Sequence, residues 1–135
     1  MDARAAAAAW ARQWLDGWRR HDPDRIVAMY APDNLHRSTP FRGVHAGREA
    51  LAAYLRDAFA EERELLDLRF GEPLVDGDRA AVEYWAVYVD AGTGRLATLA
   101  GSCFLRFGPD GLVTHSRDYW HQEDGEHTPS LEWGS

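Results

Sequence analysis

The hydrophobic period of this chain changes once, after Glu64, from about 3.6 residues to about 2. Before that point, Trp10, Trp14 and Trp18 recur at helical spacing in an apolar stripe, which predicts a helix over residues 3–20. After it, apolar and charged residues alternate, as is typical of half-buried strands. Helices that all precede the strands indicate an α+β domain.

Two more helices are expected before the strands begin. Asp22-Pro23 has the composition of a helix start, an N-cap followed by proline at the first helical position. This second helix is expected to end at Pro32, and an irregular segment is expected over residues 34–46. A third helix is expected to open at Gly47, because the apolar residues that follow it keep helical spacing.

The second half of the chain predicts strands separated by glycine-containing turns. The expected strands lie near residues 66–70, 79–90, 95–107 and 112–123. Strands this long bend, and a bent sheet with helices on its concave side would enclose a conical cavity. A flat sheet with a solid core is the alternative, which periodicity does not exclude. The whole chain, residues 1–135, is interpreted as one domain with a loose polar tail at residues 124–135.

Charge and cysteine content exclude several classes of function. The net charge is −7, which argues against a nucleic-acid partner. All 15 basic residues are arginine, so lysine Schiff-base chemistry and a Walker-A phosphate loop are excluded. Cys103 is the single cysteine, and the histidines lack metal-ligand spacing, so no metal or other cofactor is expected. No stretch is apolar enough for a membrane span or a secretory leader, and a cytoplasmic location is expected.

Three stretches in this order carry a family resemblance. They are the segment from Asp22 to Asp33, Gly47-Arg48-Glu49-Ala50-Leu51 and the closing Arg117-Asp118-Tyr119-Trp120-His121. With them the chain resembles the NTF2-like superfamily, in its SnoaL-like small-molecule branch. The resemblance implies a cone, in which a curved antiparallel sheet wraps around three N-terminal helices with a deep pocket, and it implies frequent homodimers. It implies no single reaction, because the superfamily holds many.

Two catalytic subfamilies can be compared residue by residue. The closing motif is similar to that of limonene-epoxide-hydrolase-like enzymes, in which Asp118 would match one member of a water-activating Asp–Arg–Asp group. The other two members form an Arg-x-Asp pair, and Tyr84 and Ala86 stand in their places. Ketosteroid-isomerase-like enzymes place a carboxylate just before a proline, where this chain has Thr39.

Strand parity and the family register predict which side chains face the pocket. Asp118 and His36 are the candidate catalytic residues, as a general acid or base and a partner that forms a His–Asp dyad with it. The candidate ligand-binding residues are Trp14, Trp18, Ser38, Tyr54, Phe59, Tyr84, Tyr88, Leu99, Cys103 and Trp120.

Each candidate also has a structural interpretation. Asp118 could be a carboxylate bonded to a tyrosine or to His36 for architecture alone. His36 could be a loop residue bonded to backbone or water. Tyr84 and Tyr88 could fill the core, and Cys103 is typical of a small buried hydrophobe.

The leading hypothesis is a protein that binds a mostly apolar, aromatic or polycyclic molecule. It would catalyse cofactor-free proton transfer, cyclisation, isomerisation or water addition. A non-catalytic carrier and a protein-interaction module of the transport-factor type are the alternatives. A homodimer is expected through the outer sheet face, unless the tail covers that face through Leu131 and Trp133. The outer face is predicted to expose Trp85, Val87, Val89, Val113 and Tyr119.

Overall fold

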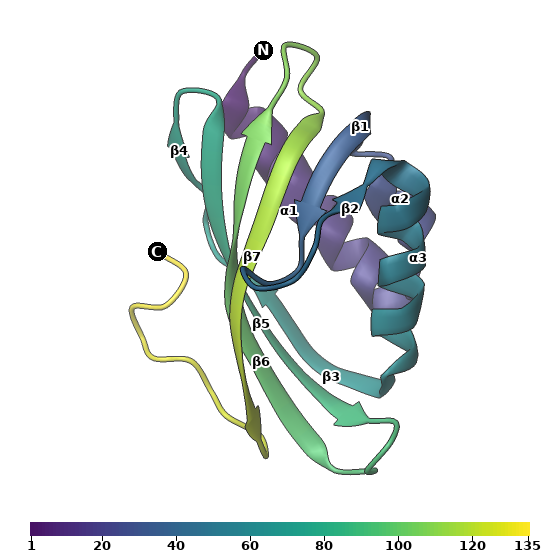
Figure 1. Ribbon diagram of the computed structural model, residues 1–135. Helices are drawn as coiled ribbons and strands as arrows, with labels where there is room; N and C mark the ends of the chain where they lie inside the picture. The colour runs from purple at the N-terminus through teal and green to yellow at the C-terminus, as the bar shows by residue number, and fades with distance from the viewer.

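The computed structural model describes residues 1–135 and has two layers, with three helices on the concave side of one curved sheet (Figure 1). The helices are α1 (Ala3–Arg20), α2 (Pro23–Val27) and α3 (Gly47–Ala60). The strands are β1 (Tyr30–Arg37), β2 (His45–Ala46), β3 (Glu62–Phe70), β4 (Leu74–Asp76), β5 (Arg79–Asp90), β6 (Leu96–Phe107) and β7 (Val113–Asp124). None of the helices combines the length and the apolar character that crossing a membrane requires.

The ends of α1 follow from local chemistry. Asp2 caps its start, because the Asp2 carboxylate accepts a hydrogen bond from the Ala5 N–H at 3.2 Å. The helix ends where His21 adopts the left-handed conformation with φ 49°. Between them, Trp10 and Trp18 are buried against the sheet, so α1 forms the inner wall of the domain.

The sheet has the order β2-β1-β7-β6-β5-β3, with β4 paired to β5. Neighbouring strands are antiparallel except β1 and β7, which pair in parallel. The expected purely antiparallel sheet is therefore a mixed sheet. The pairing with β7 places β1 beside α3 at one side of the sheet, as Figure 1 shows.

The segment after α2 differs from the expectation. The helix predicted to reach Pro32 ends at Val27, and the segment predicted to be irregular contributes the second half of β1. Its pairing with β7 is interrupted between Tyr30 and Leu35, around a proline that has no N–H to donate. The strand exists because β7, distant in sequence, supplies its hydrogen-bond partners, and local periodicity carries no signal of that.

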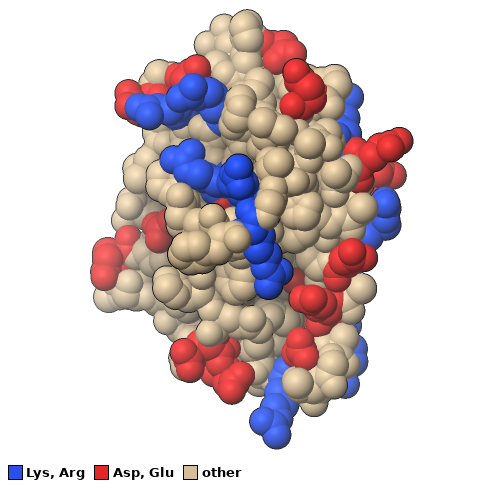
Figure 2. All heavy atoms as spheres, in the orientation of Figure 1, with Lys and Arg blue, Asp and Glu red and all other residues tan.

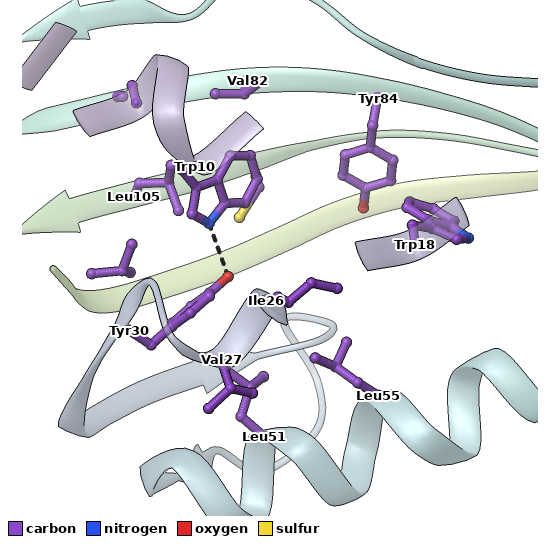
Figure 3. Packing of buried hydrophobic residues seen from close by; sticks show 14 of the residues in the cluster. Trp10, Trp18, Ile26, Val27, Tyr30, Leu51, Leu55, Val82, Tyr84 and Leu105 are labelled. Carbon is purple, nitrogen blue, oxygen red and sulfur yellow. Dashed lines mark hydrogen bonds between the residues drawn. The ribbon is translucent and has the colours of Figure 1, made fainter. Parts of the chain in front are cut away.

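The core lies between the helices and the inner face of the sheet. Twenty buried residues form one cluster, with Trp10, Tyr30, Ile26 and Leu51 among the most deeply buried. Figure 3 shows the Trp10 indole N–H donating to the Tyr30 hydroxyl, at 3.0 Å. This bond satisfies a buried polar pair inside an otherwise apolar core.

Strand β5 has the predicted facing: Tyr84 and Ala86 are buried inside, and Glu83 is exposed outside. The alternation fails where the ladder contains bulges. Val113 was predicted outside but is in the core, because the β6–β7 register shifts next to Phe107. Leu66 was predicted inside but is exposed at a register shift in β3.

Residues 125–135 lie on the convex side of the sheet, opposite the helices (Figure 1). The Trp85 indole N–H donates to the His127 carbonyl at 2.9 Å, and Trp133 packs edge-on against Trp85. Val87 is 1% exposed, although it was predicted to lie on an open outer face. The tail is thus docked rather than loose, through Trp133 but not through the fully exposed Leu131.

This docking changes the predicted dimer surface. Trp85 and Val87 are covered by the chain's own tail, and Val89 is also buried. Of the predicted interface residues only Tyr119 remains exposed, in edge-on contact with Phe104. In this structure the predicted interface is therefore not available to a second copy.

Candidate functional site

A cavity of about 150 Å³ opens between the helices and the inner face of the sheet. Its lining comes from α1, α3 and strands β3, β5, β6 and β7, and 13 of its 17 residues are hydrophobic. All predicted site residues except His36 and Ser38 line it. These are Trp14, Trp18, Tyr54, Phe59, Tyr84, Tyr88, Leu99, Cys103, Asp118 and Trp120.

His36 and Ser38 lie outside the cavity wall, which corrects their predicted positions. His36 is buried on β1, and Ser38 is buried in the bend that follows this strand. The Ser38 carbonyl accepts a hydrogen bond from the Trp120 indole N–H at 2.8 Å. His36 is 1% exposed and reaches the cavity through its neighbours, the Asp118 carboxylate and the Tyr54 ring, whose centroid lies 5.7 Å from that of His36.

Asp118 is the carboxylate that reaches the cavity from β7. Its backbone pairs with Cys103 of β6, and its side chain is 14% exposed. Burial raises the pKa of Tyr54, Tyr84 and Cys103, and the negative charge of Asp118 raises each of them further. The charge of this one carboxylate therefore raises the pKa of two phenols and one thiol that surround it.

A short polar chain holds His36 behind this carboxylate. The Nδ1 atom of His36 is 2.6 Å from the Ser116 hydroxyl, and its Nε2 is 3.4 Å from Asp118 Oδ2. His36 and Ser116 are register partners in the parallel β1–β7 pair, which is why they meet. Nε2 has no hydrogen-bond partner, so the nearest acceptor for its proton is the Asp118 carboxylate.

The tyrosines of the cavity retain their protons at neutral pH. Burial and the Asp118 charge raise the pKa of Tyr54 to about 12, and the same two causes raise the pKa of Tyr84. Figure 3 shows the Tyr84 ring extending from β5 toward the helices, with its hydroxyl at the far end. Both hydroxyls are therefore available as hydrogen-bond donors to an oxygen of a bound molecule.

Cys103 lines the cavity as a neutral group. Burial, followed by the adjacent Asp118 carboxylate, raises the pKa of its thiol well above the usual value. A nucleophilic cysteine requires the opposite shift, toward the thiolate. No group of three or more His, Cys, Asp and Glu side chains is placed to hold a metal ion.

Glu62 is the site residue that sequence reasoning missed. It is the first residue of β3, its side chain is 8% exposed, and it lines the cavity. The Trp18 indole N–H donates to both carboxylate oxygens at 2.9 Å, and His21 Nε2 is 3.2 Å from Oε1. Local sequence offered little indication that Glu62 is buried, because a glutamate shortly after the end of a helix is usually exposed to solvent.

Other lining residues were missed for simpler reasons. Trp10 and Phe70 belong to the core and also reach the cavity. Gln122 lies on the strand expected to end at residue 123, and its Nε2 donates to the Tyr88 hydroxyl at 2.7 Å. Its inward parity with Asp118 was the signal that could have identified it.

The mouth of the cavity is its open side, bordered by the exposed residues Glu61, Trp120 and Gln122. Figure 2 shows arginine side chains gathered over β7 and the β1–β2 connection, with acidic side chains along the side of α3. The face around the mouth therefore carries charges of both signs, not the single-sign field that steers highly charged ligands.

The cavity volume limits what it can enclose. An apolar cavity of roughly 150 Å³ accommodates a molecule of the size of benzene. A single aromatic ring therefore fits inside this cavity, and a polycyclic body would have to protrude through the mouth. The walls are aromatic and apolar with a few polar groups, as in sites for mostly apolar ligands.

Comparison with known proteins identifies the family. The model of a SnoaL-like domain matches residues 11–116, most of the chain. This chain belongs to the SnoaL-like family. None of the curated proteins compared with it matches.

Three solved structures are similar to this SnoaL-like protein. A Xanthomonas campestris pv. campestris protein, proposed to be a polyketide cyclase, is 25% identical with a TM-score of 0.71, covering 89% of this chain and 93% of that one. SalBIII, an epoxide hydrolase/cyclase-like enzyme of pyran ring formation in salinomycin, is 19% identical with a TM-score of 0.71 and coverage of 88% and 90%. RV0760c of Mycobacterium tuberculosis is 20% identical with a TM-score of 0.73 and coverage of 89% and 96%.

These comparisons confirm the NTF2-like α+β fold that the sequence motifs indicated. The similarity to SalBIII and RV0760c concerns the fold alone. The match to the SnoaL-like family supports a small-molecule-binding fold for this chain and leaves the reaction open.

Proposed function

We propose that this SnoaL-like domain binds a small, mostly apolar aromatic ketone and transfers a proton on it without a cofactor, leading to cyclisation or isomerisation. The observation that carries the proposal is the Asp118 carboxylate, which is 14% exposed in the wall of an apolar cavity. A carboxylate in the wall of such a cavity can lie within reach of a C–H group of an enclosed ketone, which is the geometry that general base catalysis requires. The Xanthomonas relative, proposed to be a polyketide cyclase, supports the choice of reaction class.

The proton transfer can be written from the residues present. Asp118 removes a proton from a carbon next to a carbonyl, and the C–H electron pair moves into an enolate. The hydroxyl of Tyr84 or Tyr54 donates a hydrogen bond to the enolate oxygen, where negative charge develops. The enolate carbon then either attacks a second carbonyl of the same molecule or takes a proton at another position. Asp118 returns its proton to the alkoxide or the carbon, which restores the carboxylate.

His36 is a positioning residue in this scheme. Its Nε2 faces Asp118 Oδ2 at 3.4 Å, and its Nδ1 is held by Ser116. This contact fixes the rotamer of the carboxylate without reaching the cavity itself. We expect His36→Gln to lower the rate and to change its pH profile, while leaving affinity for a neutral ligand close to wild type.

The test uses 4-phenyl-2-butanone, a one-ring ketone with exchangeable protons next to its carbonyl. In D₂O the wild-type protein is expected to accelerate deuterium incorporation above the buffer rate, measured by ¹H NMR. Asp118→Asn should lower the catalysed rate at least ~100-fold, the usual scale of a general base. Glu123→Gln, on the outer side of the same strand, is the control and should retain the rate.

Two results would contradict the proposal. If deuterium exchange with wild-type protein proceeds at the buffer rate, the protein does not transfer a proton on this class of ketone and the proposed reaction is wrong. Equal rates for wild type and Asp118→Asn would remove Asp118 as the base. If the ketone binds to both proteins with no exchange above buffer, the domain is a non-catalytic carrier instead.

A further inference from the structure

A second buried carboxylate, Glu62, lines the cavity. The proton transfer proposed for Asp118 does not involve it. Glu62 pairs with Asp90 at the last residue of β5. Asp118 pairs with Cys103, which in turn pairs with Val82 near the start of β5. The two carboxylates therefore line the same cavity at positions level with opposite ends of β5.

The walls between these two ends carry few charges. Trp18, Tyr84, Tyr88 and Leu99 all line this part of the cavity. Burial, and next the charge of Glu62, raises the pKa of Tyr88, which indicates that the Glu62 carboxylate lies close to that ring. A molecule that fills the cavity would thus have one polar region near Asp118, an apolar middle and another polar region near Glu62.

Holding Trp18 in place does not require a carboxylate. One indole N–H needs one acceptor, which a neutral amide provides without the cost of burying a charge. The second donor, His21, is 36% exposed and stacks on Phe59 with ring centroids 4.9 Å apart. A carboxylate offers about four acceptor positions, so Trp18 and His21 leave acceptor capacity at Glu62 unused on the cavity side.

We infer that Glu62 is a specificity-determining residue, which accepts a hydrogen bond from a hydroxyl or amine at the end of the ligand remote from Asp118. The inference rests on the proposed binding function of the cavity. It adds that the ligand has two polar ends, of which the end near Glu62 is a hydrogen-bond donor. A neutral apolar group at that end would leave a buried carboxylate without a partner in the bound state.

Three probes with the same phenol ring and chain length test this directly. 4-Propylphenol ends in a methyl group, tyrosol ends in a hydroxyl in the same place, and tyramine ends in an ammonium group. Binding is measured by ¹H–¹⁵N NMR titration of the indole N–H signals. Wild-type protein should bind tyrosol or tyramine about tenfold more tightly than 4-propylphenol. The Trp18 indole signal should shift further with these two probes than with 4-propylphenol, because only their end groups contact the carboxylate that accepts from Trp18.

The variants assign the preference to one residue. Glu62→Gln should lose the preference for tyramine, because the amide keeps an acceptor for Trp18 but loses the charge. Glu61→Gln is the matched control, since Glu61 borders the mouth but is exposed, and it should retain the preference. Asp118→Asn should also retain it.

The outcomes separate this inference from the proposed function. If 4-propylphenol binds wild-type protein as tightly as tyrosol and tyramine do, the role of Glu62 is wrong and the binding function stands. If no probe binds, the proposed binding function is wrong and the inference falls with it. The comparison of probes on wild-type protein needs no variant, so a folding defect of Glu62→Gln would not prevent the decision. A preference that survives in folded Glu62→Gln also overturns the inference.

Discussion

Gly101 lies directly opposite Tyr84 on neighbouring strands, and the Tyr84 ring occupies the space that a side chain there would need. A Cβ at this position would lie 2.7 Å from the Tyr119 carbonyl oxygen and 2.8 Å from Cζ of Tyr84. The first contact is with backbone, which cannot move aside as a flexible side chain can. The absence of a side chain at this position thus shapes the cavity wall.

We therefore predict that Gly101→Ala lowers the free energy of unfolding by ~1–3 kcal/mol, the range of an overpacked core. It should also weaken binding of the phenol probes, because Tyr84 must shift into the cavity. Urea denaturation and NMR titration measure the two effects. Gly43→Ala, where an added Cβ meets nothing within 4 Å, should change stability by less than about 0.5 kcal/mol. Equal stability of the two variants would contradict the packing argument.

Glu62 gives a pH-dependent prediction at the same scale. Burial raises its pKa from the ordinary 4.5, although the hydrogen bonds from Trp18 and His21 offset part of the increase. The native state therefore holds this proton more strongly than the unfolded chain does. The stability that Glu62 contributes is present below its unfolded pKa and is lost as the pH rises through the raised native value.

Wild type should accordingly lose stability relative to Glu62→Gln as the pH rises from about 4 to about 8, because the amide does not titrate. Urea midpoints at a series of pH values measure the difference. The charged neighbours of Glu62 are His21 and Glu61, so Glu61→Gln is measured in parallel; because the Glu61 charge is the smallest of the causes that raise the Glu62 pKa, this variant should keep most of the pH dependence of wild type. A constant difference between wild type and Glu62→Gln across this range would contradict a raised native pKa.

At single residues, the sequence predicted facing well wherever the ladder is regular. Alternation along β5 placed Tyr84 and Tyr88 inside because each residue there has one register partner. It failed for Val113 and Leu66, because a single extra residue reverses every side chain beyond it. Bulges depend on the fit between two strands, so one strand's sequence does not reveal them.

At the scale of elements, the predictions held where local signals were strong. The tryptophan stripe predicted α1 over residues 3–20, and Gly47 opens α3 as expected. They failed for β1, whose hydrogen-bond partner is β7, and this pairing decides where His36 lies. The sequence proposed His36 and Asp118 as a dyad, while the burial of His36 on β1 follows from a contact between distant segments that local patterns do not show.

The tail is the other element that local signals missed. Residues 124–135 are polar, yet Thr98 donates to the Gly125 carbonyl at 2.7 Å and accepts from the His127 N–H at 3.0 Å. The Gly134 carbonyl accepts a hydrogen bond from the Glu72 N–H at 2.8 Å. These hydrogen bonds fix the segment on the convex face, with Trp133 against Trp85.

We predict that Trp133→Ala destabilises the protein by ~1–2 kcal/mol, since it removes an edge-on aromatic pair together with its buried area. It should also make Trp85 more accessible, measured as quenching of tryptophan fluorescence by acrylamide. Leu131→Ala, at a fully exposed position, is the control and should leave stability unchanged. If Trp133→Ala is as stable as Leu131→Ala, the tail is not docked in solution.

For the whole molecule, the cavity lies inside the main core, and one set of aromatic residues serves both stability and binding. Trp10 and Trp14 both donate to the Tyr30 hydroxyl at 3.0 Å, so α1 is fixed to β1 by the residues that begin the cavity wall. A ligand that fits the cavity should therefore stabilise the fold as a unit, because the native state alone presents it.

The last prediction concerns alkaline unfolding. Burial raises the pKa of four of the five tyrosines, Tyr30, Tyr54, Tyr84 and Tyr88, with Tyr54 at about 12. In the unfolded chain these phenols ionise near pH ~10. Since their native pKa values are higher, the stability they contribute is complete below pH ~10 and is lost as the pH rises toward the native values.

The molecule should therefore unfold cooperatively in alkali, with the buried tyrosines ionising only as it does so. Tyrosinate absorbance and far-UV circular dichroism, followed against pH, should change together for most of the absorbance increase. Tyr84→Phe has no proton to lose there, so its stability relative to wild type should improve as the pH rises above ~10. Ionisation of all five tyrosines near pH ~10 with the circular dichroism unchanged would show that the cavity phenols are open to solvent, and the apolar site argued for Asp118 would fail with them.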